Sequence, residues 1–119
     1  MTIEEGFWLF FPAGLSSYFD MKGHREFTDE KSGSLVWAFI FEEKNQLPDG
    51  FQSSDYETKD FQEKRILDMP IRRRAVELLI RRRRWRHKIT GATLKRDLTF
   101  LAEGGKYTAD LAAFLKGGD

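Results

Sequence analysis

The stretch Ile71–Lys88, IRRRAVELLIRRRRWRHK, decides which fold this sequence adopts. It holds eight of the chain's eleven arginines, as a triplet and a quartet around the mostly apolar AVELLI. Propensity alone favours a helix over 72–88. In a helix, however, four consecutive arginines spread around nearly the whole circumference, and no apolar stripe continues past Ile80. In a strand, Val76 and Leu78 share one face with Ile80, so periodicity favours the strand.

The residues that follow complete a predicted β-hairpin. Residues 88–93, KITGAT, are typical of a turn, and residues 93–100, TLKRDLTF, can return beside the first strand. The row of core residues on the first strand continues beyond the core as Arg82, Arg84 and Arg86. The pattern therefore predicts a hairpin rooted in the core and cationic on both arms at its tip, with Arg81–Arg84 nearly dispensable for folding.

The N-terminal half contains a divided helix and two strands. Residues 3–20 have apolar positions near helical spacing, but Pro12 divides them into a first turn and a second segment, Gly14–Asp20. Residues 35–42, LVWAFIFE, predict a buried strand that ends in a loop. Residues 58–67 predict a second strand, which Asp68-Met69-Pro70 then ends.

The last segment, ADLAAFLK, predicts a short C-terminal helix with Leu111, Phe114 and Leu115 on one face, ended by Gly117 and Gly118. At 119 residues the chain is long enough for one modest core. We therefore expect a single α+β domain over 1–119: an antiparallel sheet of about four strands, an N-terminal helical segment and a short C-terminal helix.

The charge is divided unevenly along the chain, although the net charge is only +1. Residues 1–70 carry 14 acidic and 7 basic side chains, whereas residues 71–96 carry 11 basic side chains and one acid, Glu77. Segregation of this size indicates an anionic partner or an acidic partner surface. The alternative is that the acidic half folds over the basic half and neutralises it.

Several classes of function are disfavoured by composition. The chain has no cysteine, which excludes disulfides and cysteine-based metal sites and fits a reducing, cytoplasmic location. The only histidines, His24 and His87, do not make a zinc site, and the paired carboxylates lie in charged or loop segments. No apolar run approaches the length of a membrane span. We expect no catalysis, no cofactor, no membrane partner and no small-molecule substrate.

Four segments carry a resemblance to a known family: LFFPAGLSSYFD, EEKNQLP, ILDMPIRRRAVELLIRRRRW and RDLTFLAEGGKYTADLAAFLK. Together they resemble the N-terminal region of ISAon-type bacterial insertion-sequence transposases, from about Leu9 to Lys116. The most specific part is Asp68-Met69-Pro70-Ile71 followed at a fixed distance by Arg82-Arg83-Arg84-Trp85. Shortly after Ile71, Arg73-Arg74 stand where the commoner pattern has a glycine-lysine turn.

More distantly, the chain is similar to the zinc ribbon that opens ISL-type transposases. There, cysteines follow the arginine-aromatic element, whereas this chain has Arg86-His87-Lys88, so zinc binding does not carry over. The resemblance implies DNA binding at the ends of an insertion sequence. It also implies a separately encoded catalytic chain as a possible partner, because the family's acidic catalytic triad lies downstream of the matching segments.

The predicted site is a cationic DNA-binding surface. Arginine suits it because its planar fork binds phosphate, or the O6 and N7 edge of guanine, in a bidentate manner. Trp85 either stacks on an exposed base or caps the core. The predicted DNA-binding residues are Arg72, Arg73, Arg74, Arg81, Arg82, Arg83, Arg84, Trp85, Arg86, His87, Lys88, Lys95 and Arg96. Two alternatives stay open: a protein-interaction module that docks the basic arm on a separately encoded transposase subunit, and structured-RNA binding.

Overall fold

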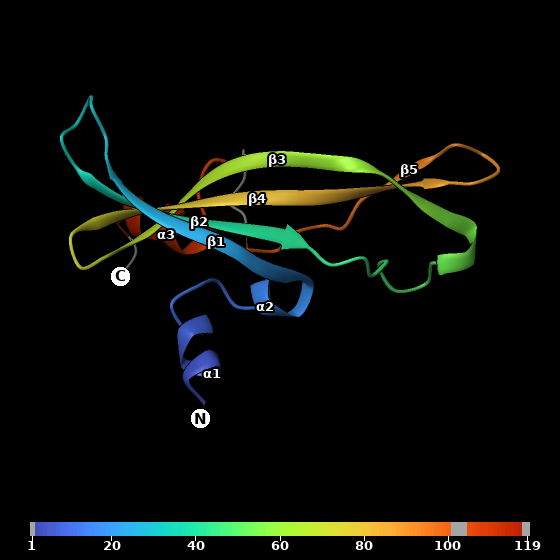
Figure 1. The fold of residues 1–119 in the computed structure, drawn as a ribbon, viewed down its shortest axis with the longest axis horizontal. Helices are drawn as coiled ribbons and strands as arrows, with labels where there is room; N and C mark the ends of the chain where they lie inside the picture. Colours follow the sequence, from blue (N-terminus) through green and yellow to red (C-terminus); the bar gives the residue numbers. More distant parts are fainter. Residues whose placement is uncertain (1, 101–104, 118–119) are drawn as a thin grey trace.

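A computed structural model describes residues 2–100 and 105–117. It is an α+β domain built on one twisted five-stranded sheet, with short helices at both ends of the chain (Figure 1). In chain order the elements are α1 (Ile3–Trp8), α2 (Leu15–Tyr18), β1 (Phe19–Thr28), β2 (Leu35–Glu43), the 3-10 turn η1 (Ser53–Asp55), β3 (Tyr56–Ile71), β4 (Arg74–His87), β5 (Thr93–Leu94) and α3 (Ala109–Leu115). None of the described helices is long and apolar enough to cross a membrane.

The sheet has the strand order β1-β2-β4-β3, and β5 pairs with the far end of β4. Strands β1 and β2 form one antiparallel hairpin, and β3 and β4 form another. The two hairpins join through β2 and β4, which run parallel. The expected α+β fold is confirmed, and the other three strand pairings are antiparallel as expected, so the pairing of β2 with β4 is the exception. After β2 the chain skips the position next to it and forms β3 one strand further away. Strand β4 then fills the gap between β2 and β3, and because it is antiparallel to β3 it runs parallel to β2.

Strand β4 confirms the strand prediction for the arginine-rich stretch, but its main partner differs from the expected one. Strand β3 pairs with it from Tyr56↔His87 to Ile71↔Arg74. Residues 93–100 contribute only the two residues of β5. The predicted break at Asp68-Met69-Pro70 is also wrong, because β3 is an edge strand and the register shift between Asp68 and Ile71 accommodates a residue without an N–H.

Strand β1 was absent from the sequence-based prediction. Its residues FDMKGHREFT are mostly polar, and Phe19 alone among them is buried. The register shifts between Met21 and Gly23, which interrupts any two-residue alternation. The segment forms a strand because it pairs with the apolar strand β2. Its own residues therefore carry no sequence pattern that predicts a strand.

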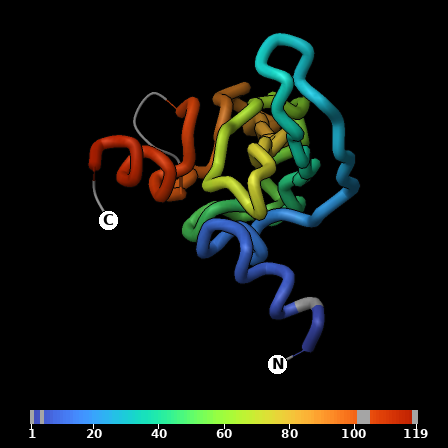
Figure 2. The backbone as a smooth tube through the Cα atoms, turned by 90° about the vertical axis from the view of Figure 1, so that its left-hand side faces the viewer, coloured from blue at the N-terminus to red at the C-terminus, as the bar shows by residue number. Residues whose placement is uncertain are grey.

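The hydrophobic core occupies one face of the sheet. Phe39 and Phe41 from β2 lie beside Leu78 and Ile80 from β4 in the parallel register. The buried cluster comprises Phe11, Leu15, Phe19, Phe39, Phe41, Ile66, Val76, Leu78, Ile80 and Phe100. Seen along the long axis, α1 and α2 lie below the sheet and α3 lies to one side of it (Figure 2). The division of the N-terminal helical segment at Pro12 is confirmed.

A buried hydrogen bond attaches the C-terminal helix to the sheet. Thr108 caps α3 by accepting from the N–H of Leu111 at 3.2 Å, and its hydroxyl donates to Asp68 Oδ1 at 2.8 Å. Burial raises the pKa of Asp68, and the hydrogen bonds from Thr108 and Met69 partly offset that rise. The predicted helix is confirmed, but Leu111 alone is buried, while Phe114 and Leu115 are exposed.

Candidate nucleic-acid interface

The far end of the β3–β4 hairpin extends beyond the rest of the sheet. Strand β2 pairs with β4 only as far as Glu42↔Arg81, and beyond it β4 continues with β3 on one side and β5 on the other. We call residues 55–64 and 82–96 the distal ribbon, which lies at the right of Figure 1. It contains nine basic and four acidic side chains, a net charge of +5.

Three arginines in the second half of β4 are paired with carboxylates from the acidic half of the chain. Arg84 makes a bidentate contact with Asp60 on β3, at 2.6 and 2.5 Å. Arg86 contacts Glu57 at 3.3 Å. Arg81 pairs with Glu42 on β2 and, at 3.4 Å, with Glu63 on β3. These contacts favour the neutralisation alternative for much of the arginine quartet.

The pair between Arg84 and Asp60 also changes the protonation behaviour of the carboxylate. The hydrogen bonds from Arg84 hold the pKa of Asp60 below its usual value of 3.8, against a smaller opposing effect of burial. The same hydrogen bonds raise the pKa of Arg84. Asp60 is therefore ionised at neutral pH and neutralises Arg84 there.

The other two arginines of the quartet have no carboxylate within ion-pairing distance among the described residues. Arg82 donates to the backbone carbonyl of Arg96. Arg83 donates to Thr58 Oγ1 at 3.1 Å and lies over the ring of Phe61, with its guanidinium carbon 4.5 Å from the ring centre. Both side chains are half-buried. No described carboxylate neutralises either side chain, but part of each guanidinium already makes a hydrogen bond.

Arg96 belongs to a buried ion pair, which corrects its assignment as a DNA contact. Its side chain is 11% exposed, and its Nε lies 3.3 Å from Oε2 of Glu43, whose side chain is 1% exposed. The other oxygen of Glu43 accepts from the backbone N–H of Arg83 at 3.0 Å. Burial raises the pKa of Glu43, and these contacts partly offset the rise. The guanidinium carbon of Arg96 lies 3.8 Å from the centre of the Tyr18 ring, so the side chain also packs against that ring.

Two further predicted contacts are structural. Trp85 is 1% exposed, and its Nε1 donates to Asn45 Oδ1 at 3.0 Å, so it is a core residue and is not available to stack on a base. The Nδ1 of His87 accepts from the backbone N–H groups of Ile89 and Thr90, both at 3.1 Å, which closes the turn before β5. These two hydrogen bonds give the His87 ring a structural role in the turn, and its predicted contact with phosphate stays a prediction.

Three cationic side chains lie around a hollow of about 350 Å³ on the distal ribbon. It is lined by Lys64, Arg82 and Lys95, together with Gln62 and Glu63. Glu63 is the one acid in this lining, and it is already paired with Arg81. Lys88 is exposed in the neighbouring turn. The sequence pattern missed Lys64, because only the pairing of β3 with β4 brings it beside Arg82 and Lys95.

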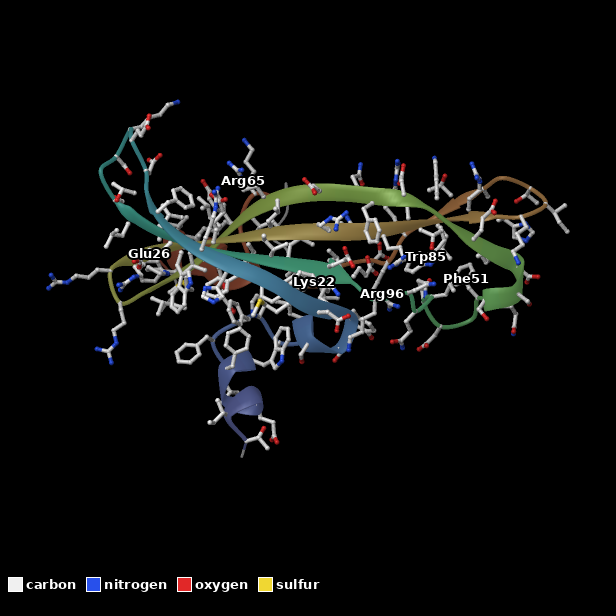
Figure 3. All side chains as sticks on the ribbon, in the orientation of Figure 1. Lys22, Glu26, Phe51, Arg65, Trp85 and Arg96 are labelled. Atoms are coloured by element: carbon white, nitrogen blue, oxygen red, sulfur yellow. The ribbon has the colours of Figure 1, made fainter. Side chains whose placement is uncertain are left out.

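The first arginine triplet lies at the other end of the molecule, which corrects the prediction of one continuous cationic surface. At about 3.3 Å per residue, Arg73 and Arg86 are about 40 Å apart along β4. The molecule measures 50 × 34 × 29 Å, so this distance covers most of its length. Figure 3 places Glu26, the partner of Arg74, at the end of the sheet opposite Trp85 and Phe51.

Within the described parts of the chain, no three His, Cys, Asp or Glu side chains are grouped closely enough to hold a metal ion. Comparison with protein-family models, curated proteins and solved structures found no match for this chain. The transposase assignment therefore remains a prediction from the resemblance of its sequence segments, and the case for an interface depends on the geometry of the distal ribbon.

Proposed function

We propose that this chain binds the phosphate backbone of duplex DNA through the distal ribbon, as a non-catalytic accessory or N-terminal part of an insertion-sequence transposase. The supporting observation is that the ribbon's own residues include nine basic and four acidic side chains, a net charge of +5. The hollow between Lys64, Arg82 and Lys95 is its most concentrated cationic part. The role at element ends, beside a separately encoded nuclease, comes from the resemblance alone.

The shape of the ribbon suits a duplex. Over residues 82–84 it is two strands wide, and a two-stranded ribbon fits the major groove of B-DNA. Lysine and arginine contacts to phosphate supply affinity without sequence preference. The pairs Arg84–Asp60 and Arg86–Glu57 hold the ribbon in its extended form, so the partner meets an ordered surface.

The test is a salt titration of duplex binding by fluorescence anisotropy. If Lys64, Arg82 and Lys95 each neutralise one phosphate, log affinity falls by about 2.7 for each tenfold rise in salt. The double variant Lys64→Gln/Lys95→Gln should lower that slope by about 1.8. Arg82 is left in place because it also donates to the carbonyl of Arg96 and so contributes to folding.

The matched control is Lys22→Gln/Lys116→Gln, which removes the same charge from two exposed positions outside the ribbon. It should leave the salt slope close to that of the parent. If both double variants lower the salt slope equally, only net charge matters for binding, and a site on the ribbon is contradicted. A parent chain that fails to bind duplex at low salt would contradict the DNA proposal itself. Competition with structured RNA separates the two nucleic acids.

A second candidate function is protein interaction, which one separate observation favours. Leu9 and Phe10, at the end of α1, are 71% and 64% exposed, and Phe114 and Leu115 of α3 are 56% and 60% exposed. Large exposed apolar side chains on a small domain often mark a protein contact. Leu9→Gln/Phe10→Gln should then weaken co-sedimentation with the nuclease chain and leave duplex binding unchanged.

A further inference from the structure

The turn between β3 and β4 places two arginines in an unusual backbone conformation. Ile71 pairs with Arg74, which leaves Arg72 and Arg73 as a two-residue loop. Their φ angles are +51° and +66°, in the left-handed region. A two-residue hairpin turn with both φ angles positive strongly favours Asn-Gly or a similar pair, because a Cβ atom makes this conformation unfavourable. Among the described residues, no other non-glycine residue has a positive φ.

The side chain of Arg74 supports this turn. It pairs with Glu26 of β1, and its Nη1 donates to the backbone carbonyl of Arg72 at 3.4 Å. Arg72 and Arg73 themselves are exposed, and within the described residues neither makes an ion pair with a carboxylate. The neighbouring strands therefore hold the turn while both of its own guanidinium groups remain available.

A hollow of about 500 Å³ adjoins the turn, lined by His24, Arg25, Glu26, Trp37 and Arg74. Its carboxylate, Glu26, is paired with Arg74. The Nδ1 of His24 accepts from Trp37 Nε1 at 3.2 Å, which holds both rings in the wall of the hollow. Arg25 lies over the ring of Phe27 and adds a further positive charge. Its charged lining residues, Arg25, Glu26 and Arg74, thus carry a net positive charge.

We propose that Arg72 and Arg73 form a second phosphate-binding site, separate from the distal ribbon. Two exposed guanidinium groups on adjacent residues of one turn, without carboxylate partners among the described residues, suit the oxygens of a phosphate group. Strained backbone persists where the surroundings hold it, and it concentrates at functional sites. The phosphate belongs either to a nucleic-acid backbone or to a free phosphorylated ligand. The site does not depend on the ribbon, so it stands or falls independently of the proposed function.

The deciding variant is Arg72→Asn/Arg73→Gly, which removes both guanidinium groups and supplies the residue pair that this turn favours. A turn that serves folding alone predicts higher thermal stability with unchanged binding. A phosphate site predicts higher stability with weaker binding. Two companion variants complete the set. Arg72→Lys/Arg73→Lys keeps the charge without the bidentate fork, and Lys22→Gln/Lys116→Gln removes the same net charge elsewhere.

Thermal melts and binding titrations use the full chain with two probes, a 20-bp duplex (about two helical turns) and inorganic pyrophosphate. We expect the Asn-Gly variant to melt above the parent. If both arginines contact phosphate, its duplex affinity should fall on the order of 10- to 100-fold at 0.1 M salt. The Arg72→Lys/Arg73→Lys variant should lose less duplex affinity, and the Lys22→Gln/Lys116→Gln control should bind duplex about as tightly as the parent. Loss with duplex alone identifies a nucleic-acid backbone, and loss with pyrophosphate as well identifies free phosphate groups.

Four results would overturn the proposal. The first two are an Arg72→Asn/Arg73→Gly variant that binds both probes as the parent does, and the same variant melting below the parent. The third is an equal loss of affinity in the Lys22→Gln/Lys116→Gln control. The fourth is a parent chain that binds neither probe. The variant Lys64→Gln/Lys95→Gln separates the two sites. If the distal ribbon fails to bind duplex but pyrophosphate still binds at the turn, the proposed function is lost while this site is retained.

Discussion

The two halves of β4 have the same neighbour, β3, yet they are stabilised differently. In the first half, Val76, Leu78 and Ile80 are at most 1% exposed and lie within the core. In the second half, residues Arg81–Arg84 are half-buried and contact carboxylates, backbone carbonyls and the ring of Phe61. The Nε of Arg82 is buried without a hydrogen-bond partner among the described residues. A strand can therefore continue past its apolar core when polar side chains on the adjacent strands supply its contacts.

The contacts of the second half differ among themselves in burial, and burial sets how much each contributes. The side chains of Arg84 and Asp60 are 27% and 40% exposed, and those of Arg86 and Glu57 are about half exposed. Exposed ion pairs contribute about 0–1 kcal/mol each. The pair between Glu43 and Arg96 is the exception, because both side chains are buried beneath the strand.

The largest effect is expected from Glu43→Leu. The substitution leaves the buried guanidinium of Arg96 without its partner, and removing one member of a buried pair costs about 3–5 kcal/mol. Urea unfolding of the variant and parent measures the difference. If the loss stays below about 1 kcal/mol, the pair behaves like an exposed one and the contrast within the second half disappears.

The double variant Glu43→Leu/Arg96→Met provides the control for that measurement. Removing both charges should recover part of the stability lost in Glu43→Leu, because no unpaired charge then remains buried. Recovery is partial because the backbone N–H of Arg83 still lacks the acceptor that Glu43 supplies. A double variant less stable than Glu43→Leu would show that Arg96 acts through its packing on Tyr18 instead.

The next effect compares the two halves directly. Leu78→Ala should cost roughly 2–5 kcal/mol, because Leu78 is fully buried and its loss leaves a cavity. Replacing Arg81–Arg84 with alanine removes three partly exposed ion pairs, two made by Arg81 and one by Arg84, and should cost less than Leu78→Ala because each such pair contributes little. The structure thus revises the expectation that the quartet is nearly dispensable. Thermal melts of both variants test the order, and a quartet variant that loses more than Leu78→Ala would reverse the comparison.

The smallest effect is a dependence on pH that distinguishes the ionic half from the apolar half. The pKa of Asp60 is lower in the folded chain than its usual 3.8, because of the hydrogen bonds from Arg84. Its stabilising contribution is therefore complete above that value and is lost as the pH falls through the folded-state pKa. Relative to the parent, Asp60→Asn should be slightly less stable near neutral pH, and the difference should vanish in acid. Melts in buffers from about pH 6 to pH 2 measure it.

Local pattern was sufficient for the elements that carry their own signal. Residues 35–42 form a nearly continuous apolar run rich in aromatic residues, which predicted a buried strand, and β2 spans Leu35–Glu43. The arginine quartet favoured a strand over an amphipathic helix, and β4 is a strand. The C-terminal helix has its cap, Thr108, directly before it. Strand β1 has no such signal, because a polar edge strand obtains its conformation from the strand beside it.

The sequence by itself determined an α+β domain, a strand through the arginine-rich stretch and the segregation of charge. Only the tertiary structure decided which arginines are free. Arg84 meets Asp60 across 24 positions of chain, and Arg81 meets Glu42 across 39, so no local pattern contains these pairs. The β3–β4 hairpin also separates the two arginine clusters, because an extended strand places residues that are close in sequence far apart in space.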